Sequence, residues 1–164
     1  MASEEADTEK APKSFSISVD LPPAGSGIQA NLQFKPILSV PSELVLVRYK
    51  IPFSLDVVPK KNLAVCTKAS STPTVDGQPG EQVNDVLRYT SQWSLGLPQN
   101  ADSLSSTAAA FSGGLSWQCS FFDVMSAKSW EQVVNALVSN TPERTDEVVL
   151  IFERAIDGTA PELA

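Results

Sequence analysis

The feature that most constrains the fold is a series of short apolar segments separated by turn residues. Three of them are Tyr49–Val58, Asn62–Thr67 and Val83–Leu87. Each is short and rich in β-branched or aromatic residues, which favours strands over helices. Lys60–Asn62 stands between the first two and is typical of a tight turn. The sequence therefore predicts antiparallel strands joined by short connections.

Four further segments extend the strand pattern. Ser14–Val19 and Ile28–Phe34 alternate polar and apolar residues with the period of two that half-buried strands show. Glu43–Tyr49 is also strand-like. Glu147–Glu153 is a nearly continuous apolar run, which predicts a strand in the middle of a sheet.

One segment, Ser129–Asn140, has the period of an α-helix. Ser129 can cap the first amides, and Gln132 three residues later completes the pattern of a capping box. The helix should present one apolar face, formed by Trp130, Val133, Val134, Leu137 and Val138. We therefore expect an α+β fold: a small, partly open antiparallel β-barrel or sandwich with one main capping helix.

The composition along the chain predicts its domain organisation. Residues 1–13 are acidic and poor in apolar groups, which predicts a flexible arm. Residues 14–41 should form a β-rich N-terminal extension, 42–155 the compact domain, and 156–164 a C-terminal tail. Within the domain, 92–127 is an aromatic-rich insertion, too long for a plain loop and too apolar for a linker.

The charge balance narrows the range of partners. The chain has 12 Lys and Arg against 19 Asp and Glu, a formal charge of −7, and no basic block. Nucleic acid is therefore not expected as a partner. No run approaches the roughly 18 to 20 apolar residues of a membrane helix, so we expect no direct membrane span.

The residue types argue against catalysis and metal binding. The chain has no histidine, the commonest general base near neutral pH and the commonest metal ligand. Cys66 and Cys119 lack Cys-x-x-Cys spacing, and we expect two free thiols with Cys66 buried in a strand. The carboxylates, Glu147 among them, should be solvated, except Asp85, which should accept backbone hydrogen bonds at a loop end. We expect no enzyme activity, no metal and no cofactor.

The order of these elements from Glu43 to Arg154 resembles the PDZ family. Members often carry a hydrophobic-Gly-Asp-x-hydrophobic signature, and Val83–Leu87 has this form with Asn84 in place of glycine. Asparagine enters left-handed backbone conformations more readily than most residues, so the exchange is compatible with the motif. The run Val149–Arg154 also looks like the last strand of the family.

The resemblance implies a peptide-binding groove, from whose usual form this chain departs. PDZ domains hold a C-terminal carboxylate on amides of a Gly-Leu-Gly-Phe-like loop, and the peptide adds as a strand beside the helix. The matching positions are Pro52, Phe53, Ser54 and Leu55, and Pro52 has no amide hydrogen to donate. Trp130 stands at the start of the helix, where its indole should fill the groove. We interpret these five residues as a degenerate peptide groove. For Phe53 and Leu55, as for Val133 and Leu137 of the helix, periodicity alone favours plain core packing.

A narrower resemblance concerns plastid proteins. The runs Ile51–Val57, Leu63–Lys68, Asp85–Ser91 and Phe122–Val124 are similar to PDZ-like proteins of plastids in algae and plants. Within that group the chain resembles a peripheral, non-pigmented photosystem I subunit of diatoms and related red-lineage algae. This implies a structural protein at the stromal face of the thylakoid membrane, with photosystem I core or antenna subunits as its partners.

The insertion concentrates aromatic residues, which dominate interface hot spots when they pack into partner pockets. The predicted partner-binding residues are Trp93, Phe111, Trp117, Phe121 and Phe122. The alternative is that they form a satellite core beneath the insertion. The Phe15–Phe34 extension is a second candidate contact element.

Two other functions are compatible with the sequence. A free PDZ-like adaptor would bind C-terminal peptides of client proteins in the plastid. A regulatory domain of a PDZ-bearing protease is less compatible, because the chain contains no catalytic segment.

Overall fold

A computed structural model describes residues 14–23, 25–96 and 116–162. Strands dominate, and one α-helix accompanies them, which confirms the predicted α+β class. The elements are β1 (Phe15–Asp20), β2 (Gln29–Phe34), β3 (Ser42–Lys50), β4 (Asp56–Lys60), β5 (Leu63–Lys68), β6 (Val86–Gly96), β7 (Ser116–Asp123), the 3₁₀-helix η1 (Val124–Ser126), α3 (Trp130–Val138) and β8 (Glu147–Ala155). No helix in these ranges is long and apolar enough to cross a membrane.

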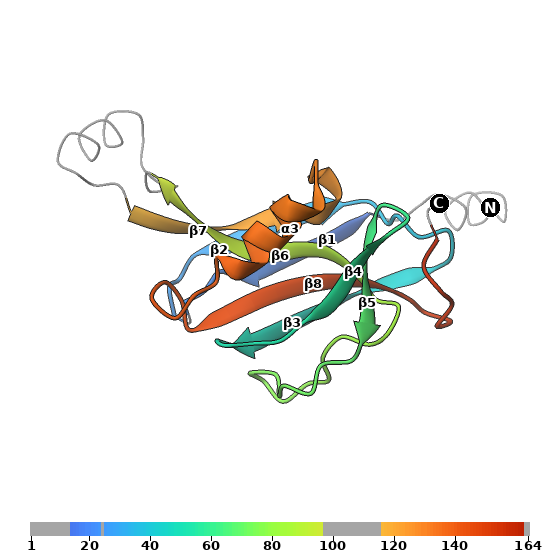
Figure 1. Ribbon diagram of the computed structural model, residues 1–164, viewed down its shortest axis with the longest axis horizontal. Helices are drawn as coiled ribbons and strands as arrows, with labels where there is room; N and C mark the ends of the chain where they lie inside the picture. Colours follow the sequence, from blue (N-terminus) through green and yellow to red (C-terminus); the bar gives the residue numbers. More distant parts are fainter. Residues whose placement is uncertain (1–13, 24, 97–115, 163–164) are drawn as a thin grey trace, which may run out of the picture.

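Six strands form the main sheet, in the order β3-β8-β6-β5-β4, and β7 pairs with β6 (Figure 1). Every pairing is antiparallel. Within the described residues β3 and β4 are the ends of this order and do not pair with each other, so the sheet does not close into a barrel.

The strand β8 lies at the centre of the fold, between β3 and β6, as its apolar run predicts. Because side chains alternate along a strand, its two faces contribute to two different cores. Val148, Leu150 and Phe152 pack toward α3 in one cluster. Val149 and Ile151 pack in another cluster, on the opposite face.

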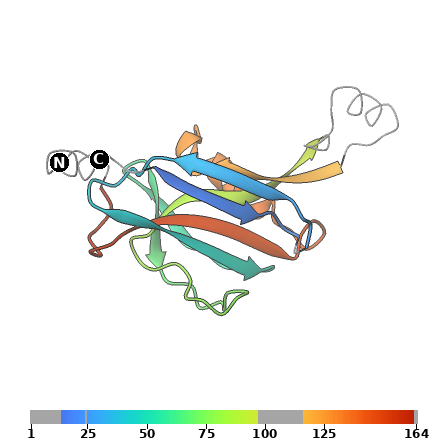
Figure 2. The ribbon, with the colours of Figure 1, turned by 180° about the vertical axis from the view of Figure 1, so that it is seen from behind.

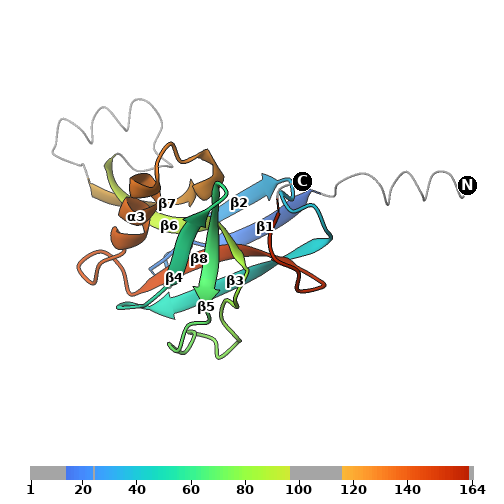
Figure 3. The same ribbon diagram turned by 45° about the vertical axis from the view of Figure 1, so that its right-hand side comes forward.

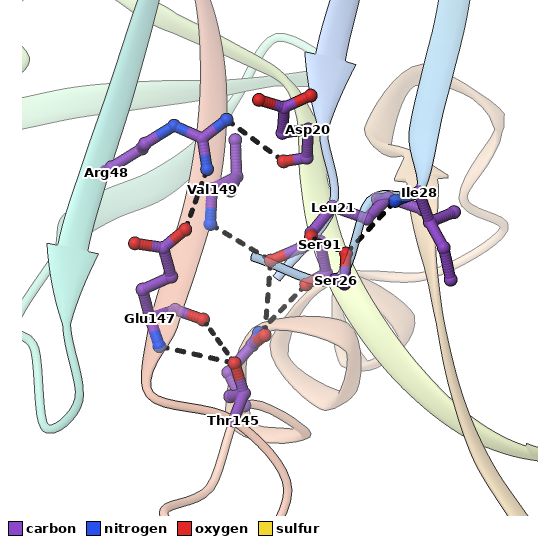
Figure 4. Close-up of polar contacts among 10 residues, drawn as sticks. Asp20, Leu21, Ser26, Ile28, Arg48, Ser91, Thr145, Glu147 and Val149 are labelled. Carbon is purple, nitrogen blue, oxygen red and sulfur yellow. Dashed lines mark hydrogen bonds and ion pairs between the residues drawn. The ribbon is translucent and has the colours of Figure 1, made fainter. Parts of the chain in front are cut away.

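The hairpin β1–β2 covers the face of the sheet opposite α3 (Figure 2). It forms what we call the hairpin-side cluster, which consists of Ile17, Val19, Leu32, Phe34, Leu44, Tyr89, Phe121, Val149 and Ile151. Arg48 of β3 also holds the hairpin: it donates to Glu147 Oε1 at 2.8 Å and to the carbonyl of Asp20 at 2.9 Å (Figure 4). Residues 14–34 therefore share a core with the main sheet.

The helix α3 begins where the capping pattern predicts. Ser129 Oγ accepts a hydrogen bond from the amide of Gln132 at 3.4 Å. The Gln132 side chain, however, accepts from the amide of Lys128 at 2.8 Å, one residue before the cap, so the capping box is shifted by one position. Val133 and Ala136 are the buried residues of the helix.

Two predicted turn features are confirmed. Lys61 and Asn62 have φ of 51° and 66°, the left-handed conformation that a two-residue hairpin between β4 and β5 requires. Asn84 has φ of 78°, so asparagine does occupy a left-handed position. Asp85 accepts from the amide of Gln82 at 2.9 Å, as expected, and also forms an ion pair with Arg154 at 2.7 Å.

The expected insertion is largely a continuation of the sheet where it is described. Residues 92–96 belong to β6, and β7 pairs with them and runs back to the main body (Figure 1). Residues 97–115, with Phe111, lie outside the described residues, as does the predicted acidic arm 1–13.

The expectation of solvated carboxylates is wrong for Glu147. It is buried and paired with Arg48, which also binds the carbonyl of Asp20 and so connects the start of β8 with the end of β1. The sequence also gave no indication that Glu153 would be fully buried. Its carboxylate pairs with Arg88 and accepts from Ser42 Oγ at 2.7 Å and from the amide of Leu38 at 3.2 Å.

Candidate functional site

An apolar groove lies between α3 and the segment formed by β4 and its preceding loop. Figure 3 shows how the two elements α3 and β4 are placed. Its volume is about 460 Å³. The loop and β4 contribute Ile51, Pro52, Phe53, Leu55 and Val57, and α3 with the residues after it contributes Trp130, Val134, Leu137, Val138, Asn140, Thr141 and Pro142. None of these lining residues is charged, so the groove suits apolar side chains.

The groove is open because the apolar face of α3 is wider than the surface that it buries. Val133 packs in the core, but Val134 is 38% exposed and Val138 is 61% exposed. Leucine or valine side chains scattered on a surface are ordinary, but these two line the same hollow. The helix pattern predicted the apolar face, and the tertiary packing leaves two of its five residues, Val134 and Val138, exposed.

Four of the five predicted groove residues come together here: Pro52, Phe53, Leu55 and Trp130. Phe53 and Leu55 also pack against the core cluster that Val148, Leu150 and Phe152 form toward α3. The Phe53 ring stacks on Tyr49, with 6.5 Å between the ring centroids. Ser54 is not among the lining residues, and its hydroxyl lies 3.4 Å from that of Thr72. We expected the Trp130 indole to fill the groove, but it lines the wall and leaves the hollow open.

Hydrogen bonds fix the end of α3 against the sheet. Asn140 donates to the carbonyl of Ser91 at 2.8 Å, and the Ser91 hydroxyl donates to Asn140 Oδ1 at 3.2 Å. The same hydroxyl accepts from the amide of Val149 at 3.0 Å, which connects β6 and β8 to the helix (Figure 4). Because Asn140 also lines the groove, one wall of the groove is anchored to the central strands.

The four predicted partner-binding aromatics that the structure describes do not form one surface. Trp93 is buried, Phe121 packs in the hairpin-side cluster, and Phe122 packs toward α3. Trp117 is 45% exposed, and the guanidinium of Arg144 lies 3.6 Å from its ring centroid. Among the described members of the set, Trp117 is therefore the one with a large exposed surface.

A buried polar pair, Tyr49 and Glu81, lies behind the groove, because the Tyr49 ring stacks on the lining residue Phe53. The Tyr49 hydroxyl donates to Glu81 Oε1 at 2.5 Å, and Glu81 is 1% exposed. Glu81 Oε2 is buried and has no hydrogen-bond partner among the described residues. Burial raises the pKa of Tyr49 to about 12 and also raises the pKa of the Glu81 carboxyl above its ordinary value. Sequence reasoning missed this pair, since Glu81 stands between Gly80 and Gln82 in a polar loop where no local pattern indicates burial.

Neither cysteine is in a disulfide, as predicted, and Cys66 is buried on β5. Burial raises the pKa of Cys66 to about 11 and that of Cys119 to about 12, so both thiols are protonated near neutral pH. In the described ranges no three His, Cys, Asp or Glu side chains are grouped so that they could hold a metal ion.

Comparison of this chain with protein families, with curated proteins and with solved structures finds no match.

Proposed function

We propose that this chain is a non-catalytic protein-interaction module of the PDZ-like type, which docks as a peripheral subunit on the stromal side of photosystem I. The observation that carries the proposal is the open apolar groove beside β4, a strand at the end of the main sheet. An apolar hollow next to a strand edge with which no described strand pairs suits an extended segment of another protein.

Two further observations support a PDZ-like module. Three strands, the Asn84-Asp85 loop, the helix and the closing strand follow one another in the order that the resemblance implies. The groove also lies between α3 and β4, where a PDZ-like domain would add a peptide strand. The plastid and photosystem parts of the proposal rest on the resemblance of the sequence runs alone.

Native fractionation of thylakoid membranes tests the docking role. The chain should migrate with photosystem I, and high salt should not release it, because apolar contacts are not screened as charge pairs are. A Val138→Ser variant should migrate free, and Val75→Ser, at another exposed valine outside the groove, is the matched control. Migration of the unaltered chain away from photosystem I would overturn the docking role.

The second candidate function is a free adaptor that captures C-terminal peptides. The open groove favours it, whereas Pro52 argues against it because proline supplies no amide for a carboxylate. Pairs of peptides that differ only in a free carboxylate or an amide at the C-terminus separate the two functions. Binding that requires the free carboxylate supports the adaptor, and equal binding supports docking of internal segments.

A further inference from the structure

A second hollow adjoins the groove near the start of α3. It has a volume of about 380 Å³ and lies between the β4–β5 turn and the residues that lead into the helix. Trp130 lines both hollows, so they form neighbouring parts of one surface. Lys128 is the one charged residue among those that line the two hollows.

Lys128 has no acidic partner within the described ranges. The three ion pairs found there all use arginine, namely Arg48, Arg88 and Arg154. The Lys128 backbone is held, because its amide donates to Gln132 Oε1, while the side chain is exposed. In a chain with a net charge of −7, an unpaired lysine at the edge of an apolar groove is available to a carboxylate of a partner.

The edge of β4 can guide an extended segment between the hollows. Lys60 and Leu63 close a two-residue turn and therefore pair with each other, which turns the backbone groups of Val57 and Pro59 outward. Pro59 has no amide hydrogen, so this edge offers a partner few backbone bonds. Side-chain contacts in the two hollows must therefore supply much of the selectivity.

The geometry also sets a direction and a spacing. Antiparallel addition to β4, the mode used by every strand pair in this sheet, would run from the Lys128 hollow toward the groove beside Pro52. The nine residues of α3 separate the two ends. At about 1.5 Å per helical residue this is about 13 Å, which an extended chain covers in about four residues.

We infer that the groove, taken as the protein-binding site proposed above, recognises an extended segment with an acidic residue about four positions before an apolar residue. The apolar side chain lies against Val134 and Val138, and the carboxylate meets the Lys128 ammonium. Trp130, which lines both hollows, contacts the residues of the segment that lie between the acidic and the apolar position.

The test measures fluorescence anisotropy of short synthetic peptides with the full chain. The first peptide has glutamate four positions before leucine, the second has glutamine in place of the glutamate, and the third has lysine there. The unaltered chain should bind the glutamate peptide about threefold to fivefold more tightly than the glutamine peptide at low salt, the upper part of the range for an exposed charge pair. High salt should reduce this preference.

Variants of the chain locate the charge. Lys128→Gln should abolish the preference for the glutamate peptide without weakening the binding of the glutamine peptide. Lys128→Glu should bind the lysine peptide more tightly than the other two. Lys35→Glu changes another exposed lysine, which follows β2 on the other side of the sheet, and should preserve the preference. Val138→Ser should weaken the binding of all three peptides to the same extent.

The outcomes separate this inference from the proposed function. Equal binding of the glutamate and glutamine peptides, or a preference that survives Lys128→Gln, overturns the acidic selectivity and leaves the binding groove intact. If none of the three peptides binds the unaltered chain, the inferred recognition motif is overturned. If Val138→Ser also migrates with photosystem I as the unaltered chain does, the groove itself is overturned as the binding site.

Discussion

The two faces of the main sheet are covered in different ways. On one face the hairpin β1–β2 closes over β8, with a fully buried ion pair between Arg88 and Glu153 beside it. On the other face α3 covers the core only in part and leaves Val134 and Val138 exposed in a groove. Both faces are built from the same strand, and its residues alternate between them.

Under the proposed function, this difference separates the residues that stabilise the fold from those that bind a partner. On the hairpin face, the apolar and polar groups contact one another in the interior. The Glu153 carboxylate is bound by Arg88, Ser42 and backbone amides. The Arg88 guanidinium lies 4.7 Å from the Phe34 ring centroid and also donates to the carbonyl of Lys35. The helix face keeps apolar surface available to a partner. Substitutions on the first face should therefore reduce stability, and substitutions in the groove should reduce binding.

The largest effect is expected from Glu153→Gln on the hairpin face. It leaves the Arg88 guanidinium buried without its carboxylate, which should lower the free energy of unfolding by about 3–5 kcal/mol. Urea unfolding measures this loss. The double variant Arg88→Met, Glu153→Gln removes both charges and should be more stable than Glu153→Gln alone; a loss below about 1 kcal/mol for the single variant would show that the pair is not essential to this face.

Two aromatics of β7 should differ in a similar way. Phe121 packs in the hairpin-side cluster and meets Tyr89 edge-on at 6.5 Å, so Phe121→Ala should cost about 2–3 kcal/mol of stability. Trp117 is exposed and stacks on Arg144, so Trp117→Ala should cost only about 0.5–1 kcal/mol. Thermal unfolding of the two variants compares them directly, and equal losses would contradict the assignment of Trp117 to the surface.

The buried carboxyl of Glu81 predicts a pH dependence. Its pKa is raised from 4.5, chiefly by burial, and Asp85 and Asp56 act in the same direction, while the Tyr49 hydrogen bond lowers it. The unfolded chain therefore loses this proton at lower pH than the folded chain does. The contribution of Glu81 to stability is full below pH 4.5 and is lost as the pH rises through the folded-state pKa.

Glu81→Gln tests this contribution, because glutamine cannot ionise. The unfolding free energies of the variant and the unaltered chain should diverge in favour of the variant as the pH is raised from about 4 to about 7. Because the other carboxylates are the same in both chains, their effects cancel in the difference between the two unfolding free energies. A constant difference across this range would show that Glu81 does not titrate differently in the folded and unfolded chains.

The smallest effect on stability is expected in the groove. Val138 is 61% exposed, so Val138→Ser should change the free energy of unfolding by less than about 0.5 kcal/mol. The same substitution should weaken peptide binding. Val149→Ala, at a fully buried position on the hairpin face, is the contrasting variant and should cost about 2 kcal/mol without altering the groove. A large stability loss in Val138→Ser would remove the distinction between the two faces.

Local structure was largely predictable from the sequence. The alternation of Ser14–Val19 and Ile28–Phe34 predicted β1 and β2 to within a residue or two, and Ser129 predicted the start of α3. The central position of β8 followed from its apolar run, Glu147–Glu153. These features depend on neighbours in the chain, whose propensities and spacing the sequence contains directly.

The candidate site was predictable only in part. Four groove residues were identified in advance, including Trp130, but the sequence did not indicate that the hollow would be open. Lys128 was missed, because a single exposed lysine before a helix has no distinctive pattern. Glu81 was also missed, since nothing nearby in the sequence indicates that its loop folds over Tyr49.

The sequence by itself determined the strands, the helix, the left-handed turns and the exclusion of histidine chemistry. Only the tertiary structure decided which apolar side chains would be covered. Glu153 lies 65 residues from Arg88, and the pair forms because β6 and β8 are neighbours in the sheet. Val134 and Val133 are adjacent valines, yet one faces solvent and the other the core. Burial depends on the surfaces that distant segments bring together, and no local pattern contains that information.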